Sequence, residues 1–353
     1  MQPAFKPAGA WTALATPFDS DGRFDAGAYT RLLEFQLTEG VQGLVPCGTT
    51  GESPTLRWEE HGAAVALAVR LAQGRAGVLA GAGSNCTREA IDGTRDAWSR
   101  GASAVLLVDC YYNGPSSLEL RTEYYERVLE AVPEVALVPY VIPGRTGCAL
   151  SPEDLAMLHG ATPDRVPAVK SASGDMLRFR RERELAGPGL NILSGDDDLT
   201  LGMMQDPLID AAGVISVMSN IAPRAVAEMC AAQREGRTTR AAELAEALAP
   251  LFAIGTCSVE SVRALPGGRQ VNITDRFRNP VPVKTMMAGL GMLSPSFRAP
   301  LGKMTASGVE RCRRTLREVF TNNPQVLTPI EEAFEVSVAA RLGDDGVWSA
   351  LAR

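Results

Sequence analysis

The sequence predicts a closed (β/α)8 barrel, the TIM-barrel architecture of the α/β class, with a helical appendage at its C-terminal end. Eight short apolar segments alternate with eight longer amphipathic or alanine-rich segments before residue 236. None of the apolar segments is followed by a hairpin signal, which indicates parallel strands joined by helices. Eight such units in a stretch of this length match a closed parallel barrel in size and period. An open, doubly wound sheet is the structural alternative.

Proline and glycine residues mark several of the element boundaries. Pro17 closes the first strand, and Gly40 and Gly74 end the first two helices, a position at which glycine is common. The predicted strands are residues 11–16, 43–47, 77–81, 104–108, 135–140, 165–170, 191–194 and 213–216. The helices that follow them are predicted at residues 26–39, 57–73, 87–100, 118–131, 152–159, 176–185, 199–204 and 223–234.

The strands are expected to stop after this repeat. Helices are predicted at residues 241–254, 281–290 and 306–320. We therefore divide the chain into a catalytic barrel domain, residues 1–236, and a C-terminal helical domain, residues 237–353. Within the second domain we interpret residues 256–279 as an insertion and residues 321–353 as an extension, with one amphipathic helix near residues 329–342.

The composition is that of a globular protein, with 353 residues of which 45% are hydrophobic. The net charge of -6, without runs of lysine or arginine, argues against nucleic acid or an anionic membrane as a partner. No stretch reaches the roughly 18 uninterrupted apolar residues of a membrane span. The seven cysteines include no CxxC pair and have no metal-ligand spacing with the two histidines. This pattern predicts reduced thiols in a cytoplasmic protein, without a disulfide framework or a metal site.

Catalytic groups of such barrels lie where strands end, and the sixth predicted strand ends in Lys170. Val166, Ala168 and Val169 give this lysine a buried approach. A desolvated ammonium loses its proton more easily and becomes a nucleophilic amine, which forms Schiff bases with carbonyl substrates. The alternative is a solvated lysine at the end of an ordinary strand.

The other strand ends supply hydroxyls, phenols and an arginine. The glycine-flanked pair Thr49 and Thr50 follows the second strand, where hydroxyls and exposed amides can hold a small carboxylate. Tyr140 ends the fifth strand, and a phenol there can relay protons. Arg145 follows in a loop with proline and glycine, which suits bidentate capture of a carboxylate. A glycine-rich turn and a surface arginine are the alternatives for these features.

Two further loops argue against cofactor and metal chemistry. Residues 81–86 lack the third glycine of a dinucleotide fingerprint, so no nicotinamide site is inferred. The three acids at residues 196–198 are expected to cap and start a helix rather than bind a metal. The remaining groups fit carbon-carbon bond chemistry on a keto acid, and no cofactor is expected.

Six motifs at these strand ends carry a resemblance to a known family. They are GTTGES at residues 48–53, YYN at 111–113, Tyr140 with PGRTG at 143–147, KSASGD at 170–175, LSGDD at 193–197 and GVISV at 213–217. Together they resemble the dihydrodipicolinate synthase and N-acetylneuraminate lyase family of class I pyruvate aldolases, and within it the dihydrodipicolinate synthase branch. The resemblance covers roughly residues 8 to 320.

The resemblance implies a covalent mechanism without a cofactor. Lys170 matches the lysine that forms the Schiff base with pyruvate. Tyr140, Thr49 and Tyr112 match the proton relay of the family, in which the last tyrosine comes from a neighbouring subunit. A homodimer or homotetramer is therefore expected.

The resemblance also implies how the substrates are held. Thr49 and Thr50 match the residues that bind the pyruvate carboxylate, and Gly195 and Ile215 are expected to line the same pocket. Arg145 matches the arginine that holds the carboxylate of aspartate semialdehyde. In this branch the product is 4-hydroxy-tetrahydrodipicolinate, on the way to lysine.

Feedback by L-lysine is a further expectation, because family members so regulated bind it in a pocket at the dimer interface. The corresponding positions here are Ser53, Pro54, Trp58, His61, Asn85, Glu89 and Tyr111. A carboxylate, an amide and an indole face suit an amino acid with a long cationic side chain. The alternative is that Trp58 and His61 only pack the start of the second helix.

Two departures from the family pattern keep a second function open. Ser171 stands where the family usually has glutamate, and Val141 where it usually has asparagine. The alternative is another pyruvate-dependent aldolase or lyase of this family that acts on a sugar acid or hydroxy-oxo acid. A non-catalytic barrel that binds a small metabolite is a third hypothesis, against which the lysine, tyrosine and threonines together argue.

Overall fold

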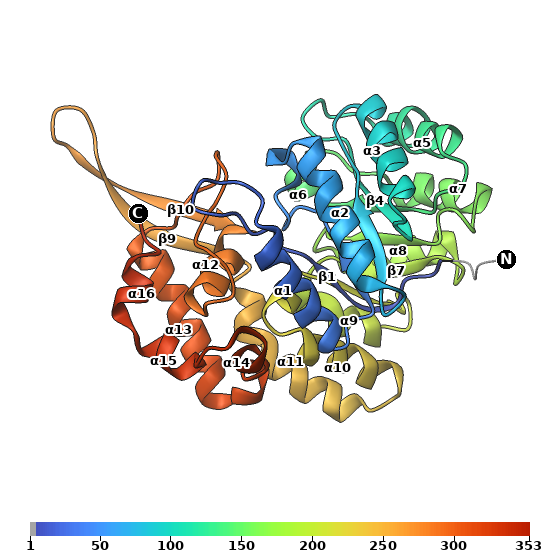
Figure 1. Cartoon of the computed structure of the whole chain (residues 1–353). Helices are drawn as coiled ribbons and strands as arrows, with labels where there is room; N and C mark the ends of the chain where they lie inside the picture. The colour runs from blue at the N-terminus through green and yellow to red at the C-terminus, as the bar shows by residue number, and fades with distance from the viewer. Residues whose placement is uncertain (1–4) are drawn as a thin grey trace.

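A computed structural model describes residues 5–353 and confirms the closed eight-stranded barrel (Figure 1). Neighbouring strands pair in parallel, and β8 pairs with β1 to close the ring. The strands are β1 (Gly9–Ala13), β2 (Gly43–Val45), β3 (Gly77–Gly81), β4 (Ala104–Val108), β5 (Leu137–Val141), β6 (Ala168–Ser171), β7 (Asn191–Ser194) and β8 (Gly213–Ser216).

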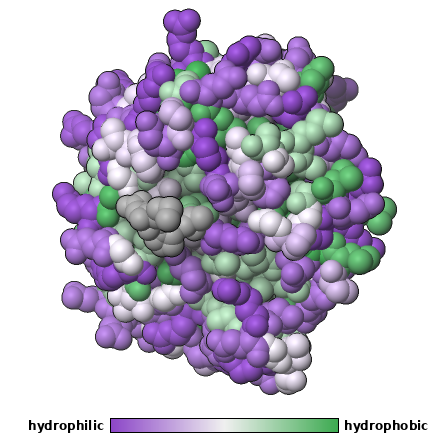
Figure 2. Space-filling view, turned by 90° about the vertical axis from the view of Figure 1, so that its right-hand side faces the viewer, coloured by the Kyte–Doolittle hydropathy of each residue, from purple (hydrophilic) through white to green (hydrophobic). Residues whose placement is uncertain are grey.

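Helices surround this ring in the predicted order. They are α1 (Ala26–Thr38), α2 (Trp58–Ala72), α3 (Thr87–Ser99), α4 (Ser117–Glu119), α5 (Glu126–Ala131), α6 (Pro143–Thr146), α7 (Pro152–Ala161), α8 (Met176–Ala186), α9 (Thr200–Gln205) and α10 (Pro223–Arg234). A π-helical segment, Leu120–Tyr125, joins α4 to α5. Figure 2 shows the face that lies away from the hairpin described below; it is mostly hydrophilic, with hydrophobic residues in scattered groups.

Trp11 fills one end of the barrel interior. A Cβ atom added to Gly43 would lie 2.0 Å from its ring, and one added to Gly77 would lie 2.5 Å away. These glycines are required because the indole occupies the space of their side chains. The ring packs edge-on against Phe5, with 5.7 Å between centroids. The interior is therefore a packed core with an open site only at the opposite strand ends.

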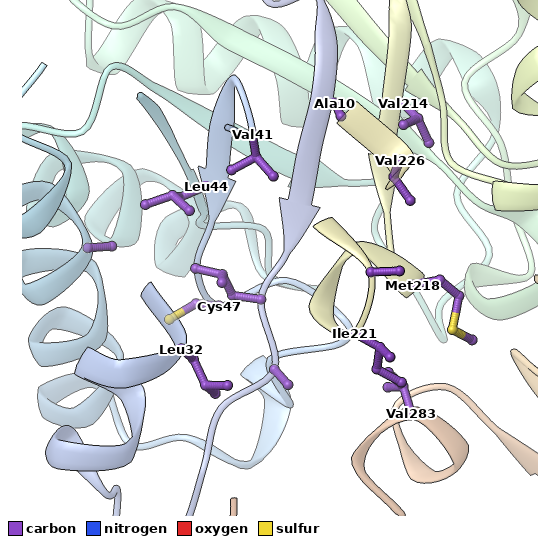
Figure 3. Close-up of a cluster of buried hydrophobic side chains, with 14 of the residues drawn as sticks. Ala10, Leu32, Val41, Leu44, Cys47, Val214, Met218, Ile221, Val226 and Val283 are labelled. Atoms are coloured by element: carbon purple, nitrogen blue, oxygen red, sulfur yellow. The ribbon is translucent and has the colours of Figure 1, made fainter. Parts of the chain in front are cut away.

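A second apolar layer lies between the strands and the helices, and it continues into the C-terminal part of the chain. Figure 3 shows Ala10, Leu44 and Val214 on the outer side of the strands. In the same cluster, Ile221 lies beside Val283 of α12 (Val281–Gly289). One continuous core thus joins the barrel to the C-terminal helices. The division into two domains at residue 236 stays a prediction.

Helices continue after the barrel as predicted, in α11 (Thr238–Ala253), α12 and α13 (Ala306–Asn322). The prediction that strands stop was wrong. Residues 256–278 form an antiparallel hairpin of β9 (Thr256–Ala264) and β10 (Gln270–Arg278), which projects from the body of the molecule (Figure 1). Polar and apolar residues alternate along β10, and Gly267 and Gly268 turn the chain with positive φ, so a hairpin signal was present.

The C-terminal extension also differs from its prediction. Instead of one helix near residues 329–342, the chain forms α14 (Pro329–Phe334), α15 (Val338–Gly343) and α16 (Asp345–Ser349). Glu335 ends α14 in the left-handed conformation, and the Ser337 side chain caps α15, which divides the segment. Trp348 is buried against Gly289, and the Arg341 guanidinium donates to the carbonyls of Ala288 and Gly289. The extension therefore covers the end of α12.

A buried ion pair ties α12 to the loop that follows β2. Lys284 of α12 and Glu52 of the loop both have fully buried side chains, and the Nζ to Oε1 distance is 2.5 Å. The amine lies 4.4 Å from the centroid of the Phe18 ring and 5.1 Å from that of Phe297. Beside it, Arg298 forms a bidentate ion pair with Glu60 of α2. Charge contacts thus hold the C-terminal helices against the barrel.

We predict strong coupling between Lys284 and Glu52. Lys284→Met leaves a buried carboxylate without its partner and should lower the free energy of unfolding by about 3 to 5 kcal/mol. Adding Glu52→Gln removes that isolated charge, so the double variant should be more stable than Lys284→Met alone. Chemical unfolding of the wild-type chain, the two single variants and the double variant measures this, with Lys6→Met, at an exposed lysine, as control. If the double variant loses the sum of the single losses, the two charges are not coupled.

Candidate active site

A cavity of about 400 Å³ opens at the carboxyl ends of the barrel strands. It brings together six of the predicted site residues, from β5, β6, α6 and two loops: Thr49, Thr50, Tyr140, Arg145, Lys170 and Gly195. The carboxyl ends of the strands are the usual place for catalysis in this architecture. The sequence prediction thus placed these residues around one cavity.

Lys170 and Tyr140 form the centre of this cavity. They are register partners on the neighbouring strands β6 and β5, and the lysine is 4% exposed. Nζ lies 4.1 Å from the centroid of the Tyr140 ring. A Cβ atom on Gly195 would lie 3.0 Å from Cε of Lys170, so the glycine leaves room for the lysine side chain. Among residues 5–353 no carboxylate forms an ion pair with this amine, which leaves it available to a carbonyl substrate.

The loop with Thr49 and Thr50 is held by contacts from distant parts of the chain. Thr16 donates a hydrogen bond of 2.7 Å to the carbonyl of Gly51. The Asn279 amide donates to Oγ1 of Thr50 at 3.0 Å. Asn279 follows β10 and was missed by the sequence analysis, which treated residues 256–279 only as an insertion. The hydroxyl of Thr50 is buried, so its position in the site is fixed.

Arg145 lies at the mouth of the cavity on the short helix α6. Its Nη2 donates to the carbonyl of Asn279 at 2.8 Å. Burial lowers the pKa of Arg145, the Tyr140 phenol raises it, and the Arg278 charge lowers it further. Arg278 of β10 in turn donates from Nη1 to the carbonyl of Gly144 at 3.0 Å. The hairpin therefore borders the loop that carries the predicted carboxylate-binding arginine.

The acids after β7 start a helix as predicted, with Asp196 at the N-cap position, but their side chains bond to neighbouring loops instead of capping it. A 3-10 helix does begin at Asp197, but neither Asp196 nor Asp197 caps it with its side chain. Asp196 accepts from the amide of Gly174 at 3.1 Å, and Asp197 accepts from the amides of Val217 and Met218, both at 3.0 Å. Burial raises the pKa of Asp197 to about 6. These bonds hold the loops after β6, β7 and β8 together.

Three predicted positions have side chains away from the cavity. Ile215 packs in the barrel interior, and Val217 is the β8-side residue that lines the site. Ser171 is buried and donates to the carboxylate of Glu182 on α8 at 2.9 Å. Val141 belongs to the layer between strands and helices. Since neighbouring residues of a strand face opposite sides, both departures from the family pattern lie outside the barrel.

Tyr112 is not brought to Lys170 within one chain. It lines neither of the two large cavities at the strand ends, is 89% exposed and has a φ of 78°. Such a φ is uncommon for a residue with a side chain. The adjacent Tyr111 is half-buried and turned the other way, into the second cavity.

A second cavity, of about 350 Å³, lies next to the first. It is lined by six of the seven residues predicted to bind lysine: Ser53, Pro54, Trp58, His61, Glu89 and Tyr111. The seventh, Asn85, is exposed and not in its lining. Thr49, Tyr140 and Arg145 line both cavities, so the two share a wall.

The second cavity carries charges of both signs, Glu89 and the Arg145 of the shared wall, which suits an amino acid with a cationic side chain. The carboxylate of Glu89 accepts from Oγ of Ser84 at 2.7 Å. Trp58 and His61 lie with their ring centroids 5.1 Å apart. Burial lowers the pKa of His61, so its ring is neutral at pH 7 and does not repel a cation. Glu89 is left as the acid of this cavity.

Among residues 5–353 there is no group of three or more histidine, cysteine or acidic side chains placed to hold a metal ion. No helix in the same range is both long and apolar enough to cross a bilayer.

Comparison with known proteins agrees with this geometry. A 4-hydroxy-tetrahydrodipicolinate synthase of Maridesulfovibrio salexigens is 40% identical over 296 residues, which are 83% of this chain and 91% of that protein. A protein of the same name from Methanothrix thermoacetophila is 40% identical over 312 residues, which are 88% of this chain and 96% of that protein. Both names match the branch that the motifs indicated.

Solved structures and a family model give the same result. The dihydrodipicolinate synthase of Aquifex aeolicus has a TM-score of 0.78 at 36% identity, covering 91% of this chain and 99% of that one. A structure of the enzyme from Cyanidioschyzon merolae with lysine bound has a TM-score of 0.77 at 30% identity, covering 88% and 98%. The model of the Dihydrodipicolinate synthetase family matches residues 6–265. The chain therefore belongs to the dihydrodipicolinate synthetase family.

Proposed function

We propose that the chain is a lyase of the class I aldolase type that condenses pyruvate with L-aspartate 4-semialdehyde to 4-hydroxy-tetrahydrodipicolinate, in lysine biosynthesis. The observation that carries this proposal is the Lys170 amine, which lies against the Tyr140 ring in a cavity with two threonines and an arginine. The relatives named above for this activity support it. The alternative with a sugar acid loses its support, because Ser171 and Val141 face away from the cavity.

The first step is formation of a Schiff base. The Lys170 amine attacks the keto carbon of pyruvate, and the carbinolamine loses its oxygen as water to give an imine. Tyr140 is next to the amine and can pass the protons that this exchange requires. The hydroxyls and amides of the Thr49 and Thr50 loop hold the pyruvate carboxylate.

The second step joins the two substrates. Loss of a proton from the methyl carbon of the imine gives an enamine, and this carbon attacks the aldehyde carbon of the semialdehyde. The new alkoxide takes a proton from the tyrosine relay, and attack of the substrate amine on the imine carbon releases Lys170. Arg145, at the mouth of the cavity, holds the semialdehyde carboxylate.

The proposal includes a homo-oligomer in which Tyr112 completes the relay of the neighbouring subunit. Its phenol is 89% exposed and remote from its own cavity, which fits a residue that serves another chain. The proposed location is the cytoplasm, and all seven cysteines, which lie within residues 5–353, are free thiols.

We also propose that L-lysine binds in the second cavity. Glu89 can pair with an ammonium group, Trp58 offers an indole face, and neutral His61 adds no positive charge. Since Thr49 and Tyr140 form part of the wall of this cavity, a ligand there can alter the proton relay without entering the active site.

Borohydride trapping tests the nucleophile. Reduction in the presence of pyruvate should fix one pyruvate adduct per chain at Lys170, because the imine is reduced to a stable secondary amine. Lys170→Ala should form no adduct and lose essentially all turnover, whereas Lys6→Ala, at an exposed lysine, should behave as the wild-type chain. Mass spectrometry of peptides locates the adduct. An unmodified Lys170 at saturating pyruvate would contradict the proposed function.

Complementation tests the shared site. The Lys170→Ala chain should have low activity because it lacks the nucleophile. The Tyr112→Phe chain should have low activity because it lacks the phenol that completes the relay of its neighbour. In a mixed dimer, one site combines the intact Lys170 of one chain with the intact Tyr112 of the other. Activity of co-expressed chains should therefore exceed the mean of the two separate variants. Activity equal to that mean would show that Tyr112 acts within its own chain or not at all.

Inhibition tests the second cavity. Added L-lysine should lower the initial rate, and Glu89→Gln should weaken this inhibition while the uninhibited rate is kept, since the glutamine still accepts from Ser84. The control is Asp92→Asn, which removes an exposed charge one turn further along α3. Full inhibition of Glu89→Gln would mean that lysine binds elsewhere.

A further inference from the structure

The hairpin brings two arginines to the active-site cavity. Arg276 and Arg278 are two residues apart on β10, so both lie on the same face of the strand, and both line the cavity with Arg145 and Lys170. The opposite face carries Phe277 and Asp275, which are partly buried. The alternation of the strand thus directs the arginines to the site and the apolar ring away from it.

These arginines have no acidic partner in the described chain. Among residues 5–353, neither Arg276 nor Arg278 nor Arg145 forms an ion pair with a carboxylate, whereas Arg263 of the same hairpin pairs with Asp275 at 2.8 Å. Arg278 and Arg145 each donate one hydrogen bond to a backbone carbonyl, and no hydrogen bond of the Arg276 side chain is found. Most of their N–H groups therefore remain for a ligand.

Two of the three acids that line the same cavity are engaged elsewhere, and the third, Asp198, is exposed and forms no ion pair with the arginines within residues 5–353. Asp196 accepts from Gly174, and Asp197 accepts from Val217 and Met218. Three guanidinium groups around one cavity repel one another, and an anion that enters between them removes this repulsion. Guanidinium groups bind carboxylates through two parallel hydrogen bonds, which gives both affinity and orientation.

We propose that Arg276 and Arg278 act with Arg145 to bind the carboxylate of the acceptor aldehyde, so that the hairpin is a specificity element of the active site. The inference rests on the proposed function and extends it: the acceptor must carry an anionic group at the end remote from the reacting carbon. The Schiff base at Lys170 forms before the acceptor enters and does not need the hairpin arginines.

Steady-state kinetics of Arg276→Gln, Arg278→Gln and the double variant test this. The KM for aspartate semialdehyde should rise about tenfold or more for each arginine, the effect expected of a lost charge-assisted hydrogen bond. The KM for pyruvate and the borohydride adduct at Lys170 should not change. Arg269→Gln is the matched control, because it removes the same charge from the exposed turn of the same hairpin.

A second readout uses the acceptor itself. The wild-type chain should prefer aspartate semialdehyde over propanal, which has no carboxylate, and the double variant should lose most of this preference in kcat/KM. Arg278→Lys should recover part of it, since a positive charge is restored without the bidentate geometry.

The outcomes are distinct. An unchanged KM for aspartate semialdehyde in both glutamine variants would overturn the inference. A loss of the pyruvate adduct as large as the loss of semialdehyde use would also overturn it, because the arginines would then support the structure of the whole site. Absence of the adduct in the wild-type chain would overturn the proposed function and the inference with it.

Discussion

The buried pair of Lys284 and Glu52 is the contact on which the arrangement of the active-site rim depends. Glu52 follows Thr49 and Thr50 in the loop after β2 and has a left-handed backbone conformation, while Lys284 belongs to α12, far along the chain. Both charges are removed from water, so each needs the other. The pair fixes α12, and Asn279, which lies two residues before the start of α12, can then bond to Thr50 and Arg145.

The site itself combines an unpaired amine with a cationic mouth. Lys170 lies in the enclosed end of the cavity beside Tyr140, whereas the arginines lie where the cavity opens beside the hairpin. This order suits two substrates that bind one after the other, with the keto acid at the enclosed end and an anionic aldehyde at the open end. The second cavity is separated from the first by residues that belong to both.

Much of the fold could be predicted because its signals are local. Short apolar segments, amphipathic segments and the glycines between them gave the eight βα units, and parallel strands place all their ends at one side. This is why Lys170, Tyr140, Thr49 and Arg145 could be assigned to one site before their distances were known. Even the outward direction of Ser171 follows from the alternation of a strand in which Lys170 points inward.

The alternating sequence of residues 270–278 likewise indicates a strand of a hairpin, but nothing in it indicates which surface the hairpin faces. The positions of Arg276, Arg278 and Asn279 at the active site depend on packing between segments more than a hundred residues apart. Such contacts arise from burial of charges and apolar surface in the folded chain. The sequence by itself therefore determined the barrel and the place of Lys170 at a strand end, and only the tertiary structure decided which residues surround that lysine.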